Sequence, residues 1–267
     1  MISRTCLVPA LGCAMLLHLP LDAQSAPRSL MLEQLTSQEL RAALDGGYRT
    51  VLIFSGSIEA SGPHLALGKH NMKVPVYARR IAERLGHTIV GPVISVAPNG
   101  QDLMRFPGTI ALQPATFAAL NEDVSRSLIQ GGFRNIVLLG DHGSGQDVLR
   151  DVATRLNAEF SATGVRVFFS SDGYAKSRAE ILAYAKARGL DADGHGGVWD
   201  TSELWAVDAS AVRPRLMAAG TPAGGAVDSR GVSGDPKGSS AALGRVFAKI
   251  RVDNAVAEIR RMLAEGK

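Results

Sequence analysis

The sequence predicts a single layered α/β domain in which helices flank a mostly parallel central sheet. Short apolar runs that suit buried strands alternate with longer helical patterns, which is typical of parallel β-α-β units. The chain has 267 residues, of which 46% are hydrophobic, so it can bury one large core. Neither an internal repeat nor a long linker interrupts the sequence. We therefore expect one domain over residues 27–267.

The expected elements follow in chain order. Residues 29–44 have a helical pattern, in which Thr36 and Glu39 have the spacing of a capping box where a helix begins. Strands are expected where apolar, often β-branched runs stand next to glycine, at 50–56, 87–98, 135–143 and 165–173. Further helices are expected over about 72–85, 114–129, 146–160, 176–188, 201–207 and 240–263. A stretch rich in glycine, proline and serine, 220–240, is expected to form a loop over the site.

The first 26 residues have the features of a secretory signal peptide. Arg4 supplies positive charge, an apolar run extends from Cys6 to Leu21, and small residues follow it. The run is short and contains His18, unlike a membrane span. We expect a periplasmic protein with no membrane partner after cleavage; the alternatives are an uncleaved anchor or a misassigned start. Both cysteines lie in this leader, so the mature chain would have no disulfide and no thiol nucleophile.

The charge distribution bears on the class of partner. The formal net charge is +4, and the charged residues, 20% of the chain, are spread along it. No dense Lys/Arg cluster is interleaved with aromatic residues, which make up only 5% of the chain. This pattern excludes nucleic acid as the expected partner and leaves a small molecule.

Polar residues follow two predicted strands at their carboxyl ends, where open α/β sheets bind ligands. The stretch SGSIEASGPHLALGKHNMK places Glu59, His64 and His70 in one glycine-bearing loop. The stretch GDHGSGQD places Asp141 and His142 at the end of another strand. Carboxylate and imidazole groups suit zinc or manganese. The alternative interpretation is a set of polar turns and helix caps with satisfied side chains.

A third stretch, HGGVWDTSELW, adds to these two. His195 precedes two glycines, and Asp200 opens a predicted helix, where an aspartate is commonly only a cap. Trp199 and Trp205 can line a pocket or fill the core. The three stretches together hold four of the five histidines outside the leader. That concentration favours one shared polar site.

Five stretches in order resemble the successive motifs of the creatininase (creatinine amidohydrolase) family: GSIEASGPHLALGKH, FPGTIAL, LLGDHGSG, HGGVWDTSELWAV and GVSGDPKGSSAALG. The resemblance covers residues 35–266. It implies a layered α/β fold, a homo-oligomer, and a two-metal site that activates water to hydrolyse a C–N bond in a cyclic or linear amide. A nearby histidine or acid would move the protons.

The resemblance can be carried over position by position. Glu59, His64, His142 and His195 stand where the family has the same residues, and the resemblance implies that Glu59 is a metal ligand.

Other positions depart from the family pattern. Ser61 replaces a ligand histidine, and His70 replaces the aspartate that bridges the metals. Ser144 stands where creatininase has an acidic residue, and Asp200 stands in place of a glutamate. These departures affect one metal position more than the other.

We therefore expect one well-bound divalent ion, zinc in the first place and manganese as the alternative, held by Glu59, His70 and His142. A serine hydroxyl is a poor ligand, so the second ion should be absent, weak, or rebuilt with Asp141 or Asp200. The residues expected to act in catalysis are His195, Asp200 and His64. The residues expected to line the substrate pocket are Ser61, Ser144, Trp199 and Arg105.

The function that this sequence favours is metal-dependent hydrolysis of a non-peptide C–N bond in a small cyclic or linear amide other than creatinine. One alternative is a non-catalytic periplasmic protein that binds a small molecule on the same fold. Another is a metal-free hydrolase, with Ser61 or Ser144 as the nucleophile and His195 or His142 as the base.

Overall fold

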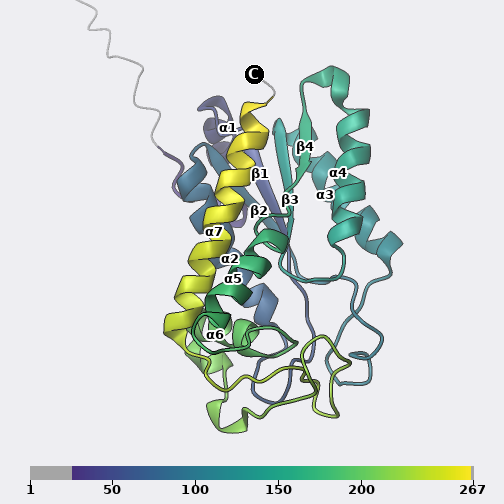
Figure 1. Ribbon diagram of the computed structural model, residues 1–267. Helices are drawn as coiled ribbons and strands as arrows, with labels where there is room; N and C mark the ends of the chain where they lie inside the picture. Colours follow the sequence, from purple (N-terminus) through teal and green to yellow (C-terminus); the bar gives the residue numbers. More distant parts are fainter. Residues whose placement is uncertain (1–25, 266–267) are drawn as a thin grey trace, which may run out of the picture.

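A computed structural model describes residues 26–265 (Figure 1). The predicted signal peptide therefore lies almost wholly outside the described residues. Within the described part, no helix combines the length and the apolar character that crossing a membrane requires.

The central sheet is parallel throughout, as expected. Its strands are β1 (Thr50–Ser55), β2 (Thr88–Ile94), β3 (Asn135–Gly140) and β4 (Arg166–Phe169), in the order β2-β1-β3-β4. All three strand pairs are parallel, and β1 pairs with β3 along its whole length, from Thr50 opposite Asn135 to Ser55 opposite Gly140. The predicted α/β fold is confirmed.

The helices lie close to their predicted positions. They are α1 (Ser37–Asp45), α2 (Lys69–Leu85), α3 (Pro114–Gly131), α4 (Gln146–Glu159), α5 (Ala175–Lys186), α6 (Val198–Val207) and α7 (Ala241–Ala264). Short 3-10 turns occur at Leu32–Gln34, Ser161–Thr163, Ala209–Ala211 and Pro214–Leu216.

Side chains along each strand point alternately to the two faces of the sheet, and each face packs against its own layer of helices. In β1, Val51 and Ile53 pack with residues of α1, α3 and α4, whereas Leu52 and Phe54 pack with residues of α2 and α7. Because both faces of the sheet are covered, its strands are apolar on both sides. Figure 1 shows the long helix α7 beside α2 on one side of the sheet, with α3 and α4 on the other side.

The first predicted helix begins later than expected. The backbone is extended at Leu35 and Thr36, which separates a 3-10 turn from α1. The predicted capping box is present: the Glu39 backbone N–H donates to Thr36 Oγ1 at 3.2 Å, and the Thr36 N–H donates to Glu39 Oε2 at 2.7 Å.

Helix α2 begins earlier than expected. The sequence predicted a loop up to about residue 72, but the helix starts at Lys69, directly after Gly68. Lys69 and His70 therefore lie in the first helical turn, so their direction is fixed by the helix rather than by a loop.

Helices α6 and α7 pack unusually closely at Gly244. A β-carbon built on Gly244 would lie 1.8 Å from the backbone oxygen of Ser202 in α6, which is far inside van der Waals contact. The absence of a side chain at Gly244 is therefore what allows this crossing.

We expect Gly244→Ala to lower the free energy of unfolding by about 1–3 kcal/mol or more, because the two helices must move apart. Urea denaturation followed by circular dichroism measures this. Gly131→Ala is the matched control, since Gly131 is also helical and a β-carbon built on it would have nothing within 4 Å. Equal midpoints for the two variants would contradict the packing argument.

Candidate metal centre

The chain direction places the site at one edge of the sheet. From β1 the chain runs to β2 on one side, and β3 lies on the other side of β1, so the strand order reverses between β1 and β3. Ligands bind in the crevice at the carboxyl ends of strands at such a switch point. Glu59 follows β1, and Asp141 and His142 follow β3 directly. The Asp141 N–H donates to the Ser55 carbonyl at 2.8 Å and keeps the two strand ends together.

Three buried side chains form a compact group at this edge. Glu59 Oε1 lies 2.9 Å from His70 Nε2, and Glu59 Oε2 lies 2.6 Å from His142 Nε2. One ligand atom from each residue falls within 4.8 Å of the other two. We call Glu59, His70 and His142 the ligand triad. The structure thus brings together the three residues expected to hold one ion.

The triad fits a divalent metal ion. Although His142 Nε2 is close to Glu59 Oε2, the contact lacks hydrogen-bond geometry, and Oε2 has no other hydrogen-bond partner among residues 26–265. A buried carboxylate oxygen without a hydrogen bond is costly unless a cation satisfies it. One carboxylate and two imidazoles form a donor set that zinc and manganese both accept.

Asp141 stands behind the triad rather than in it. Its Oδ2 lies 2.5 Å from His70 Nδ1, the ring nitrogen that faces away from Glu59. A carboxylate there accepts a hydrogen bond from the Nδ1–H, which keeps the proton on Nδ1 and leaves Nε2 with the lone pair that a metal requires. The structure therefore places the predicted ligand Asp141 where it orients a ligand.

Asp141 is itself held by buried cations. Arg251 in α7 donates to Asp141 Oδ1, and Lys73 Nζ lies 3.3 Å from Oδ2. Burial would raise the pKa of Asp141, but Arg251 and Lys73 outweigh it and hold that pKa well below its usual value. Glu203 completes the group, 3.0 Å from Lys73 Nζ and 3.2 Å from Arg251 Nη1.

A second buried ion pair lies on the other side of Glu59. The Lys69 side chain is 1% exposed, and its Nζ lies 3.1 Å from Glu59 Oε1 and 2.7 Å from Asp200 Oδ2. Burial would lower the pKa of Lys69, but Asp200 and Glu59 raise it above the ordinary value. Burial would raise the pKa of Glu59, yet the Lys69 ammonium holds that pKa well below its usual value. Lys69 is therefore an ammonium ion and Glu59 a carboxylate at neutral pH.

His195 lies beside this pair in a defined tautomer. Its Nε2 is 2.7 Å from the Ala60 carbonyl oxygen, which only accepts, so Nε2 carries the proton and Nδ1 the lone pair. Nδ1 lies 3.8 Å from Glu59 Oε1. Burial and the nearby Lys69 lower the pKa of His195, so the ring is neutral at pH 7.

Ser61 and His64 lie behind the site. Ser61 Oγ is 3.1 Å from His195 Nε2, but that nitrogen already donates to Ala60, so it is not free to act as a base for the hydroxyl. His64 is fully buried, with Nε2 2.9 Å from the Gly196 carbonyl, and it fixes the turn that carries His195. Neither side chain lines the cavity.

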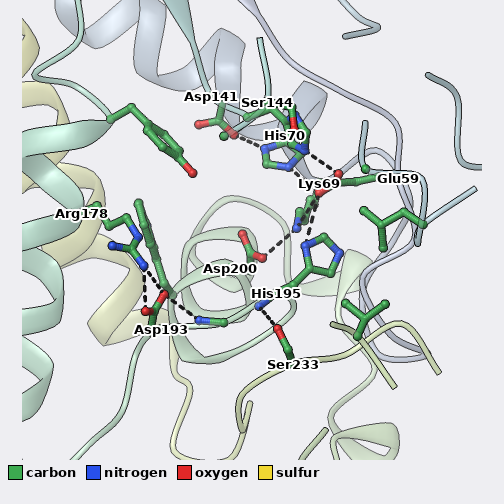
Figure 2. Close-up of a pocket in the computed structure, with 18 of the residues that line it drawn as sticks. Glu59, Lys69, His70, Asp141, Ser144, Arg178, Asp193, His195, Asp200 and Ser233 are labelled. Atoms are coloured by element: carbon green, nitrogen blue, oxygen red, sulfur yellow. Dashed lines mark hydrogen bonds and ion pairs between the residues drawn. The ribbon is translucent and has the colours of Figure 1, made fainter. Parts of the chain in front are cut away.

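The cavity in front of the triad has a volume of about 400 Å³. Glu59, His70 and Lys69 lie on one side, and the paired side chains of Arg178 and Asp193 lie across from them (Figure 2). Further lining residues are Lys73, Gly100, Asp102, Leu103, Asp141, His142, Gly143, Ser144, Tyr174, Gly194, His195, Trp199, Asp200, Gly224, Gly225, Val227, Ser233 and Arg251.

The predicted pocket residues divide into two groups. Ser144 and Trp199 line the cavity, as expected, and the 220–240 loop contributes to its wall. Arg105 does not line it. Its Nη2 donates to the backbone oxygens of Val227 and Asp228 at 2.8 and 2.9 Å, so it anchors that loop from outside.

Sequence reasoning missed the buried charges around the triad: Lys69, Lys73, Glu203 and Arg251. The spacing of residues in α2 contains a signal for two of them, Lys69 and Lys73. The buried face that contains Val74, Tyr77 and Ile81 continues backwards onto Lys69 and Lys73. Charged residues on an apolar helix face indicate a buried ionic site.

Comparison with known proteins identifies the family. The family model for creatininase, described as creatinine amidohydrolase, matches residues 33–259. The chain belongs to the creatininase family. The creatinine amidohydrolase of Pseudomonas putida is 26% identical over 190 residues, which cover 67% of this chain and 72% of that relative.

Another relative within the family has a different name. The mycofactocin precursor peptide peptidase of Mycobacterium ulcerans (strain Agy99) is 27% identical over 240 residues, covering 82% of this chain and 87% of that protein. Among solved structures, the manganese form of creatininase matches with a TM-score of 0.76 at 22% identity, over 88% of this chain and 99% of that chain. The Zn-Zn type of an E122Q creatininase mutant matches with a TM-score of 0.75 at 21% identity, over 88% and 98% of the two chains. These structural matches confirm the fold.

We expect Asp141→Asn to weaken zinc affinity by about 10–100-fold. The neutral asparagine amide would hold the His70 tautomer less firmly than the charged Asp141 carboxylate does. Competition with a chromogenic chelator measures this. Asp147→Asn is the control, since Asp147 lies on the surface of α4 in a pair with Arg150. Unchanged affinity in a folded Asp141→Asn protein would show that Asp141 does not support the triad.

Proposed function

We propose that this creatininase-family chain is a hydrolase that depends on one divalent ion, zinc or alternatively manganese, held by Glu59, His70 and His142. The observation that carries the proposal is the buried ligand triad at the sheet's switch point, with an unsatisfied carboxylate oxygen facing an imidazole nitrogen. The bound ion would supply a Lewis acid that polarises a carbonyl and eases deprotonation of water.

The chain's own residues supply proton transfer. His195 is neutral and its Nδ1 lone pair lies on the triad side of the cavity. It can accept the proton of the attacking water and return that proton to the leaving nitrogen as the C–N bond breaks. Asp200 remains ionised, because its burial, which would raise its pKa, is outweighed by Lys69 and Lys73. Asp200 therefore fixes Lys69 rather than donating protons.

The cavity restricts the substrate to a small amide or to one segment of a peptide. The rings of Tyr174 and Trp199 lie 5.8 Å apart and form a partly apolar wall that suits a planar group. The restriction to non-peptide bonds stays a prediction, because a relative is named as a peptide peptidase. Creatinine itself is not the proposed substrate, because Ser61, His70 and Ser144 depart from the family pattern.

Catalysis is favoured over the binding-only alternative, because a proton carrier stands beside the ligand triad on the same cavity. The serine-nucleophile alternative is disfavoured for Ser61 by its burial and by the tautomer of His195. We further propose a periplasmic homo-oligomer after removal of the leader, which rests on the sequence and the family resemblance.

The mature protein should contain about one zinc or manganese per chain under metal-replete conditions, measured by plasma mass spectrometry after gel filtration. Glu59→Gln and His70→Ala should each lose the ion, since each removes one of three ligands. His87→Asn is the matched control, because the His87 ring packs at a tilt against Tyr48, away from the triad. No ion in the parent protein would refute the metal-dependent mechanism.

Hydrolysis should be found in a screen of lactams, cyclic ureides and short peptides, and chelation should abolish it. His195→Gln should lower kcat by about 10²–10⁴-fold while the metal content stays unchanged, because the proton carrier is lost and the ligands remain. Full activity in this variant would mean that another group moves the proton.

A further inference from the structure

We propose that the Lys69 ammonium occupies a second cation position, so that the site combines one divalent ion with one positive charge belonging to the chain. The inference deepens the proposed function and rests on it, since it presumes a divalent ion at the ligand triad. With one divalent ion at the ligand triad, the Lys69 ammonium would stand where a second divalent ion would otherwise bind.

The two oxygens of Glu59 face different partners. Oε2 faces His142, whereas Oε1 lies 3.1 Å from Lys69 Nζ and 2.9 Å from His70 Nε2. One carboxylate thus links the triad to the ammonium. Figure 2 shows Lys69 between Glu59 and Asp200, with His195 beside it.

The groups near Lys69 Nζ include further metal-ligand types, although their atoms are not gathered as tightly as those of the ligand triad. Glu59 Oε1 and Asp200 Oδ2 both contact Nζ, and His195 Nδ1 lies 3.8 Å from the same Glu59 oxygen. Two carboxylates and an imidazole suit zinc or manganese. Since Nζ is within 3.1 Å of both carboxylates, it fills the space in which an ion would contact them. Removing the ammonium would leave two carboxylates and an imidazole that line the same cavity, and an ion in place of Nζ would draw them together.

The other buried cations do not take this position. Lys73 and Arg251 pair with Asp141 and Glu203, on the far side of His70. Of the buried lysines and arginines in residues 26–265, Lys69 alone forms ion pairs with both Glu59 and Asp200. Its loss would leave the buried carboxylate of Glu59 and the partly buried carboxylate of Asp200 without that cation, which is unfavourable until another positive charge enters.

The test is the number of ions bound by Lys69→Ala. The purified mature chain is loaded with zinc, passed through gel filtration and analysed by mass spectrometry, and a manganese-loaded sample is measured by electron paramagnetic resonance. We expect one ion in the parent protein and two in Lys69→Ala, with magnetic coupling between the two manganese ions. Lys69→Ala with Asp200→Asn should return to one ion.

Arg79→Gln is the control, since it removes a cation of the same helix that pairs with Glu83 at the surface, and it should stay at one ion. If Lys69→Ala is unfolded in chelator, zinc should restore its fold, because the second ion replaces the lost charge. Failure of zinc to restore it would overturn the proposal.

The outcomes separate the two proposals. One ion in both the parent and a folded Lys69→Ala overturns the second cation position and leaves the single-metal hydrolase standing. Two ions in the parent, or loss of the only ion in Lys69→Ala, also overturn it. No ion in the parent refutes the proposed function itself, and the Lys69 inference fails with it.

Discussion

The burial of the Glu59 carboxylate is the constraint on which the rest of the site depends. A carboxylate taken out of water is strongly unfavourable unless its charge is matched and its oxygens find donors or a cation. Glu59 meets this need with groups from two elements: Lys69 and His70 from the first turn of α2, and His142 from the end of β3. The crevice therefore has the geometry that brings Lys69, His70 and His142 to the Glu59 carboxylate.

The network of buried charges extends from Glu59 to Arg251 in the last helix, α7. His70 contacts Asp141, Asp141 contacts Arg251 and Lys73, and both cations contact Glu203. Removing one partner of a buried ion pair costs about 3–5 kcal/mol, so each member restricts what its neighbours can become. The last helix is thus part of the site, because Arg251 reaches the ligand triad through Asp141.

The fold was largely readable from the sequence because its signals are local. Apolar runs and helical periodicity located the strands and helices, and the Thr36–Glu39 spacing located the start of α1. The strand-end argument brought Glu59 and His142 to one edge of the sheet, whereas the choice of His70 as their fellow ligand rested on the resemblance to the creatininase family. The network of Lys73, Glu203 and Arg251 was not readable, because its contacts join residues far apart in sequence. The earlier start of α2 was hidden because Gly68, which caps it, provides no side-chain signal.

Because Arg251 lies in the final helix, the site is complete only when α7 is in place. Until α7 has packed, Asp141 lacks its arginine partner and His70 lacks a firmly charged carboxylate behind it. A nascent chain that has already formed its sheet is therefore still unable to present the finished triad. The ion proposed for the triad would therefore meet the complete set of supporting contacts only once α7 has packed against Asp141.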